Sequence, residues 1–220
     1  MSSPLTKLDR PAHIAPMPKP PKIRSVCVYC GSGEGSDPSF AIAARSFGRL
    51  LAEANVRLVY GGGGLGLMGA LANSVTAHGG HVTGIIPGFL KDRERPPASN
   101  EETLVVADMH ERKRMMFERA DAFVALPGGI GTLEELVEQL TWAQLGRHKK
   151  PILLLNQNGF WNPLLNLIAH MRLYAFIRPD IEVRYMVAER IEDVLPMLQA
   201  AVERAGKASP QAQEVVGERF

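Results

Sequence analysis

Short apolar runs alternate with segments of helical periodicity along most of the chain. This alternation is typical of a parallel sheet whose strands are joined by crossover helices. The apolar runs predict strands at Ile23–Tyr29, Val56–Tyr60, His81–Ile86, Thr103–Ala107, Ala122–Leu126, Pro151–Leu155 and Val183–Val187. The periodic segments predict helices at Pro38–Ala54, Leu67–His78, Glu111–Ala120, Thr132–Leu145, Trp161–Met171 and Ile191–Arg204. We therefore expect one doubly wound α/β domain, with helices on both faces of a mainly parallel sheet of about seven strands.

Capping residues and apolar stripes support individual helices. Asp37 and Pro38 are residue types favoured at the N-cap and at the first helical position. The segment from Thr132 carries an apolar stripe at helical spacing, and Gly146, followed by basic residues, marks its end.

Composition sets the limits of the domain and the class of protein. Residues 1–22 are rich in proline and lysine and predict a disordered arm, residues 23–204 carry the α/β pattern, and residues 205–220 form a polar C-terminal tail. The net charge is +2, and no apolar run approaches the ~20 residues that cross a bilayer. We therefore expect a cytoplasmic protein that binds neither nucleic acid nor membrane.

Cys27 and Cys30 form a C-x-x-C motif at a predicted strand. Side chains three residues apart on a strand point to opposite faces, so the two sulfurs should diverge. No second cysteine pair or suitably spaced histidine pair completes a metal site. We therefore expect two buried, reduced thiols and no bound metal.

Three glycine-containing segments follow predicted strands, namely CGSGEGSD, YGGGGLGLMG and PGGIGT. The carboxyl ends of parallel strands share one edge, so these loops should converge there. The second loop also matches the dinucleotide fingerprint G-x-G-x-x-G. That match is weak, because the loop follows the second strand and no acidic residue occurs from Ala70 through Lys91. No glycine-rich segment ends in Gly-Lys-Ser/Thr, so the chain is not a P-loop ATPase.

The third loop combines features that suit a sugar phosphate. Backbone N–H groups of Gly128–Thr132, with the Thr132 hydroxyl, can hold a phosphate at a helix start. Glu135 and Glu138 are neighbours on one helix face and suit the sugar hydroxyls. Glu134 is rotated by about 100° from Glu135, so we expect it to face solvent and complement the helix dipole.

The segment MHERKRMM, residues 109–116, lies near the same edge and would alone indicate a solvated helix face. Its M-x-x-R-K motif at Met109–Lys113, together with P-G-G-x-G-T-x-x-E at Pro127–Glu135, resembles the LONELY GUY family. These are cytokinin riboside 5′-monophosphate phosphoribohydrolases, often mislabelled lysine decarboxylases. The family's YGGGxxGLMG and C-G-S segments are present as well, although Gly33 replaces its usual second serine. The resemblance covers roughly residues 23–204.

The resemblance implies a Rossmann-like homodimer without a cofactor. It also implies a hydrolase that cleaves the N-glycosidic bond of an N6-substituted adenosine 5′-monophosphate and releases the free base and ribose 5-phosphate. Arg112 and Glu135 fall on the family's catalytic pair. The implied substrate-binding positions are Ser32, Gly62, Gly63, Met109, Lys113, Gly128, Gly129, Ile130, Gly131, Thr132 and Glu138.

Other functions stay open at the level of sequence. One is an AMP nucleosidase with adenine as its main base. Another is a non-catalytic nucleotide-binding module, since a fold does not determine a function. The presence of both Arg112 and Glu135 favours an enzyme. A lysine decarboxylase would need a lysine that forms a Schiff base with pyridoxal phosphate, and Lys113 is a poor candidate.

Overall fold

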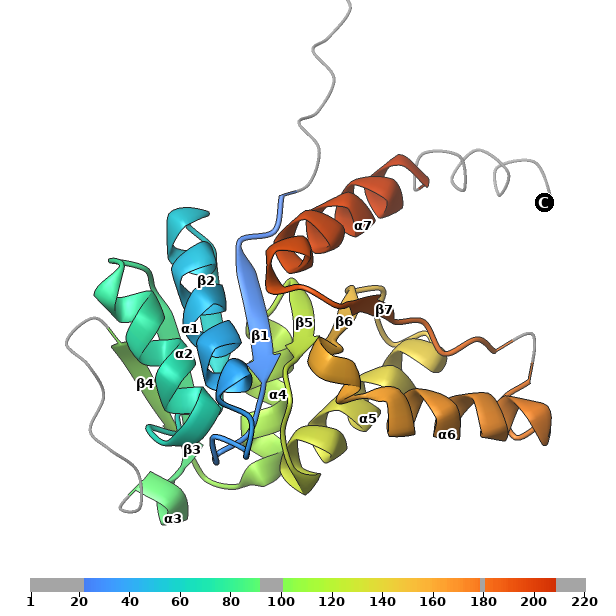
Figure 1. Cartoon of the computed structure of the whole chain (residues 1–220), viewed down its shortest axis with the longest axis horizontal. Helices are drawn as coiled ribbons and strands as arrows, with labels where there is room; N and C mark the ends of the chain where they lie inside the picture. The colour runs from blue at the N-terminus through green and yellow to red at the C-terminus, as the bar shows by residue number, and fades with distance from the viewer. Residues whose placement is uncertain (1–21, 92–100, 179–180, 209–220) are drawn as a thin grey trace, which may run out of the picture.

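A parallel sheet with strand order β4-β3-β2-β1-β5-β6-β7 forms the centre of the computed structural model, which describes residues 22–91, 101–178 and 181–208 (Figure 1). The strands are β1 (Ser25–Tyr29), β2 (Arg57–Tyr60), β3 (Val82–Pro87), β4 (Glu101–Val106), β5 (Ala122–Ala125), β6 (Ile152–Leu155) and β7 (Met186–Ala188). The α-helices are α1 (Pro38–Glu53), α2 (Gly66–Ala77), α3 (Gly88–Lys91), α4 (Met109–Arg119), α5 (Ile130–Gln144), α6 (Asn162–Leu173) and α7 (Val194–Ala208). Two 3₁₀ turns, η1 (Gln157–Gly159) and η2 (Ile191–Asp193), complete the described elements.

The strand order reverses between β1 and β5. The chain adds β2, β3 and β4 on one side of β1, then returns to pair β5 with the other side, for example Val26 opposite Ala122. This is the topological switch point of a doubly wound sheet, where the loops after two adjacent strands separate and leave room for a ligand. The predicted doubly wound, Rossmann-like fold is confirmed.

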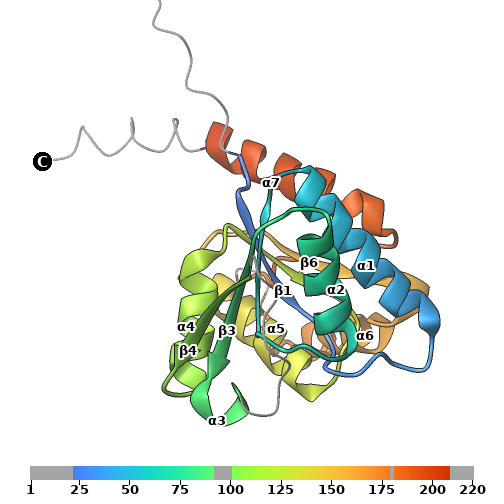
Figure 2. The same ribbon diagram turned by 90° about the vertical axis from the view of Figure 1, so that its left-hand side faces the viewer.

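Helices cover both faces of the sheet and create two apolar clusters. One cluster joins α1, α2 and α7 to the sheet, through residues such as Phe47, Leu71 and Leu198. The other joins α4, α5 and α6 to the opposite face, through Met116 and Leu136 among others. Figure 2 shows α1 and α2 on one side of the sheet and α4 on the other.

The two cysteines lie in different clusters. Cys27 packs on the face covered by α4, α5 and α6, and Cys30 packs on the face covered by α1, α2 and α7. Both are buried and free, and burial raises the pKa of each thiol above its ordinary value. The predicted divergence of the two sulfurs is confirmed.

The predicted strand Val183–Val187 is misplaced, because β7 covers only Met186–Ala188. The apolar side chain of Val183 suggested a strand, but it packs in the cluster below α6. Arg172 donates a hydrogen bond to the Val183 carbonyl at 3.3 Å, which provides a side-chain partner in place of a strand ladder. Pairing with β6 begins only at Met186.

Several helix bounds also differ from the prediction. The helix α4 begins at Met109 rather than Glu111, because Asp108 caps it by accepting a hydrogen bond from the Glu111 N–H at 2.8 Å. The helix α7 continues to Ala208, and the short α3 was not predicted. Residues 1–21 of the predicted arm, and the predicted tail beyond Ala208, lie outside the described residues.

Within the described ranges, every helix is too short or too polar to cross a membrane.

Candidate active site

The three glycine-containing loops meet at the carboxyl edge of the sheet, at the lower side of Figure 1. The Gly31 N–H donates to the Pro127 carbonyl at 3.0 Å, which joins the loops after β1 and β5. The Leu67 N–H donates to the Gly31 carbonyl at 3.0 Å, which joins the loops after β1 and β2. The predicted convergence of the loops is therefore confirmed. We call this edge the rim.

The helix α5 starts at the rim without a side-chain cap. Gly129 is its N-cap residue, and Ile130 is its first residue, two positions earlier than predicted. With no side chain to accept from the first turn, its N–H groups are available to an anion. Ideal Cβ atoms at Gly129 and Gly131 would meet no atom within 4 Å, so this turn faces open space.

Gly128 and Thr132 pack closely beneath that turn. A Cβ on Gly128 would overlap the Thr132 hydroxyl and would lie 2.9 Å from the Gly31 nitrogen. Thr132 is buried, unlike its exposed neighbours Ile130 and Gly131. The close approach of the loops after β1 and β5 therefore requires a residue without a side chain at position 128.

Arg112 of α4 and Glu135 of α5 form a nearly buried ion pair at the rim. The Arg112 Nη2 lies 3.4 Å from the Glu135 Oε1, and the two side chains are only 11% and 10% exposed. Arg112 also donates through Nε to the Ile85 carbonyl of β3 at 3.2 Å, and its Nη1 lies 3.8 Å from the Met109 sulfur. These contacts hold the guanidinium in one orientation.

Gly61 determines how closely Arg112 can approach the sheet. A Cβ at this position would overlap the Arg112 Nη2 and lie 3.1 Å from its Cζ. The sequence interpretation selected Gly62 and Gly63 but not Gly61. Gly61 is the first glycine after a buried strand, a position where glycine usually marks a turn, and its neighbour Arg112 lies on a helix distant in sequence. Gly62 instead has a φ of +76°, which suits glycine in this turn.

Burial raises the pKa of Glu135 to about 6, although the nearby Arg112 opposes that shift. Desolvation disfavours the charged carboxylate, and the positive guanidinium favours it. A carboxyl group that changes protonation near neutral pH can exchange a proton during a reaction cycle.

Lys113 lies beside this pair and contacts two other carboxylates. Its Nζ lies 2.5 Å from an oxygen of Glu134 and 3.0 Å from an oxygen of Glu138. Burial alone would lower the pKa of Lys113, but the hydrogen bonds to the two glutamates outweigh that effect and raise it. Lys113 is therefore held as a cation.

The position of Glu134 corrects part of the prediction. Its side chain is 52% exposed, as expected for a solvent-facing residue, but it also pairs with Lys113. Glu138 was grouped with Glu135, three residues away. It is also four residues from Glu134, and this equally favourable helical spacing brings Glu134 and Glu138 to one lysine. The predicted rotation between Glu134 and Glu135 is confirmed, because they face different cations.

Ser32 lies on the exposed part of the first loop, beside the second loop. A Cβ at Gly66 would overlap the Ser32 carbonyl group, and Gly66 has a φ of +58°. The structure thus brings the predicted site positions of all three loops and of α4 to one rim.

Among the described residues, no group of three or more histidine, cysteine, aspartate or glutamate side chains is arranged to hold a metal ion.

The family model described as "possible lysine decarboxylase" matches residues 68–198. A probable cytokinin riboside 5′-monophosphate phosphoribohydrolase of Oryza sativa subsp. japonica is 44% identical over 195 residues, covering 89% of this chain and 77% of the relative. Two cytokinin riboside 5′-monophosphate phosphoribohydrolases of Arabidopsis thaliana are also similar. One is 44% identical, with coverage of 88% and 86%, and the other is 50% identical, with coverage of 72% and 74%.

Solved structures share the fold at low sequence identity. A molybdenum cofactor binding protein from Rippkaea orientalis has a TM-score of 0.61 and 22% identity, covering 84% of this chain and 99% of that chain. A Moco carrier protein from Chlamydomonas reinhardtii has a TM-score of 0.60 and 17% identity, with coverage of 82% and 98%. At such identity the likeness supports the fold alone.

Proposed function

We infer that this chain, which belongs to the LONELY GUY family of cytokinin riboside 5′-monophosphate phosphoribohydrolases, is an N-glycosyl hydrolase. Its substrate is an adenosine 5′-monophosphate, N6-substituted as in cytokinin nucleotides. The products are the free base and ribose 5-phosphate. The observation that carries this proposal is the Arg112–Glu135 pair beside an uncapped helix start.

The geometry supports one orientation of the nucleotide. The phosphate binds the first-turn N–H groups of α5, where the helix dipole favours an anion. Glu135 lies one turn further along the same helix, within reach of the ribose attached to that phosphate. The proposal also includes substrate contacts at six further positions of the rim, namely Ser32, Gly62, Gly63, Met109, Lys113 and Glu138.

The reaction breaks the C1′–N9 bond through a sugar with oxocarbenium character, as in glycoside hydrolysis. Water adds its oxygen to C1′, and the departing base takes up a proton at its nitrogen. The Glu135 carboxylate stabilises the positive sugar and accepts a proton from the attacking water. Arg112 does not deprotonate, so it orients Glu135 and stabilises charge rather than moving a proton.

The direct test is incubation with AMP, N6-isopentenyl-AMP and adenosine, followed by chromatography for the free base. We expect both nucleotides to be cleaved and adenosine to react at least roughly a hundredfold more slowly, because it cannot bind the helix start through a phosphate. The ratio of the two nucleotide rates separates a cytokinin nucleotide hydrolase from an AMP nucleosidase. Equal turnover of adenosine and AMP would contradict the phosphate-dependent orientation. Nucleotide binding without release of base would identify a non-catalytic module.

The rate should depend on pH through Glu135. Its pKa is about 6, and the active form is the carboxylate, so activity should rise as pH increases through 6 and level off above 7. Below pH 6 we expect a fall of about tenfold per unit, as for loss of one ionised group. Measurement of kcat/KM for AMP between pH 5 and 8 checks this, because kcat/KM reports the ionisation of groups in the free enzyme. A rate that stays constant down to pH 5 would exclude the carboxylate as the active form.

A lysine decarboxylase is not supported by the environment of Lys113. An amine that forms a Schiff base must lose its proton, whereas Glu134 and Glu138 raise the pKa of Lys113. A cytoplasmic location stays a prediction.

We propose that the chain forms a homodimer through the outer end of α6. Leu173 and Phe176 are 80% and 84% exposed, and Tyr174 between them is also exposed. Figure 1 shows α6 extending away from the sheet. Exposed apolar groups of this density indicate an interaction surface, and a two-fold axis is the commonest way to cover one. We expect Leu173→Glu/Phe176→Glu to change the sedimenting species from two chains to one. A dimer that survives both substitutions would place the interface elsewhere.

A further inference from the structure

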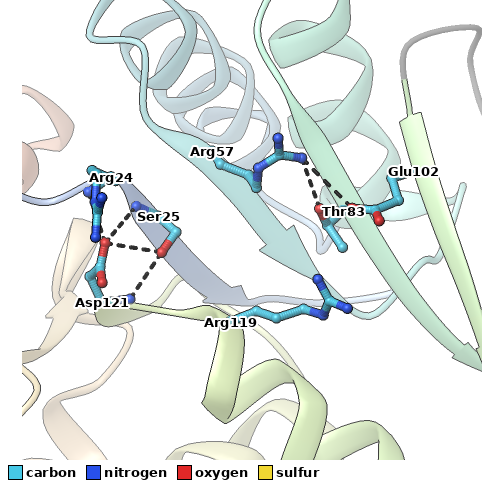
Figure 3. A pocket seen from close by; sticks show the side chains of 7 residues that line it. All are labelled: Arg24, Ser25, Arg57, Thr83, Glu102, Arg119 and Asp121. Carbon is cyan, nitrogen blue, oxygen red and sulfur yellow. Dashed lines mark hydrogen bonds and ion pairs between the residues drawn. The ribbon is translucent and has the colours of Figure 1, made fainter.

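A second hollow lies at the amino edge of the sheet, opposite the rim, where the strands begin (Figure 3). Its volume is about 440 Å³. Three arginines from separate elements line it: Arg24 directly before β1, Arg57 at the first position of β2 and Arg119 at the end of α4. None of them belongs to the proposed reaction.

The two carboxylates in the hollow already have partners. Asp121 accepts hydrogen bonds from the backbone N–H groups of Arg24 and Ser25, at 2.9 and 3.0 Å, and from the Ser25 hydroxyl at 3.1 Å. Glu102 accepts from the Thr83 hydroxyl at 2.9 Å. Both carboxylates therefore serve to bind the sheet together at its edge.

The guanidinium groups are less well neutralised. Arg57 donates to the Thr83 hydroxyl at 3.1 Å and lies 3.8 Å from a Glu102 oxygen, which fixes its direction but leaves other N–H donors free of a carboxylate. Within the described ranges, the side chains of Arg24 and Arg119 are in no ion pair. Arg119 ends α4 and complements its dipole there, but this accounts for only one of the three arginines.

Positively charged side chains are concentrated at the amino edge of the sheet. A neighbouring hollow of about 660 Å³ shares Arg24 and Asp121 and adds Lys22, Lys149 and Lys150. The two hollows together carry six cationic side chains against two carboxylates, an excess of four positive charges. The net charge of the whole chain is only +2. A concave surface with such an excess attracts anions.

We propose that the arginine-lined hollow binds a small molecule that carries a phosphate group, at a site separate from the rim. Guanidinium forks match the oxygens of a phosphate in two-bond geometry, and several forks from fixed elements can surround one such group. The two carboxylates at the walls would repel the many negative charges of a long polyanion. They suit a compact ligand, from whose hydroxyl groups they can accept hydrogen bonds. The ligand class is therefore inorganic phosphate or a small phosphate ester.

The test measures the rise in melting temperature caused by inorganic phosphate, relative to sodium chloride at equal ionic strength. Three proteins are compared: wild type, Arg24→Gln/Arg119→Gln, and the charge-matched control Arg184→Gln/Arg190→Gln. The two control side chains are exposed, one before β7 and one after it. We expect the double variant at the hollow to lose about half or more of the rise, because one of two phosphate sites is removed. The control should keep the full rise.

Hydrolysis of AMP without added phosphate should be unchanged in Arg24→Gln/Arg119→Gln, which shows that the rim and the fold are intact. An equal rise in all three proteins would assign phosphate binding to the rim alone and overturn the proposal. If the double variant is less stable before phosphate is added, Arg119→Gln alone must show a reduced rise for the proposal to stand. A parallel measurement with ribose 5-phosphate at the same concentration distinguishes a phosphate ester from inorganic phosphate as the ligand. If ribose 5-phosphate raises the melting temperature more than inorganic phosphate does, and the double variant loses this difference, the ligand is a phosphate ester. If the two compounds raise the melting temperature equally, the hollow recognises the phosphate group itself.

Discussion

Substitution of Glu135 by glutamine is expected to lower the turnover of AMP by roughly a hundredfold or more, the scale on which enzymes lose acid–base or electrostatic assistance. Glutamine keeps the size of the side chain and removes the charge that faces the Arg112 Nη2 at 3.4 Å. The phosphate contacts at the start of α5 do not involve this charge, so binding of AMP should be retained. Chromatographic release of adenine measures the turnover, and calorimetric titration with AMP measures the binding.

The matched control is Glu134→Gln, the neighbouring residue on the same helix. Its side chain is 52% exposed, and Lys113 keeps its contact with Glu138 at 3.0 Å when Glu134 is neutralised. Loss of this contact should cost at most about 1 kcal/mol, because Glu134 is exposed and Lys113 keeps a second carboxylate, so activity should be close to that of the wild type. Equal losses in the two variants, or a loss confined to Glu134→Gln, would mean that the wrong glutamate faces the sugar.

Substitution of Gly61 by alanine should also reduce turnover by roughly a hundredfold, because small displacements of a catalytic group cost about that much. The new methyl group would overlap the end of the Arg112 side chain, which can move aside without unfolding the protein. Arg112 would then leave both Glu135 and the Ile85 carbonyl. The fall should appear in the turnover number and leave AMP affinity largely intact.

Gly33→Ala is the control for this change. Gly33 lies in the adjacent loop of the same rim, but a Cβ there would meet no atom within 4 Å. We expect near wild-type activity and the same melting temperature as wild type. If Gly33→Ala and Gly61→Ala lose activity alike, the rim is sensitive to any added methyl group and the position of Arg112 is not the cause.

Local patterns were sufficient to predict the fold in outline. A strand buried on both faces is a continuous apolar run, and this pattern located β1, β2, β3, β5 and β6 despite shifted ends. The edge strand β4 was located from its shorter apolar run, although Val105 in it is exposed. The prediction failed at β7, where the apolar Val183 belongs to the core without belonging to a strand. Periodicity indicates that a residue is buried, but its hydrogen-bond partners depend on other elements.

The candidate site was predictable only in part. The glycine loops and the helix start after β5 could be located from sequence, because the direction of parallel strands decides which loops share an edge. The role of Gly61 could not, since glycine after a strand is usually a turn residue and only its contact with Arg112 gives it another function. The ion pairs of Lys113 with Glu134 and Glu138 were not predicted for the same reason, because both glutamates lie on a different helix.

The sequence by itself determined the types and order of the elements, the opposite faces of Cys27 and Cys30, and the meeting of three loops at one edge. These features follow from side-chain period and chain direction, which are local properties. Only the tertiary structure decided that Arg112 faces Glu135 while Lys113 faces Glu134 and Glu138. It alone also brought arginines from three elements to the amino edge. Such contacts depend on how each helix rotates and slides against the sheet, which is set by the packing of the whole core.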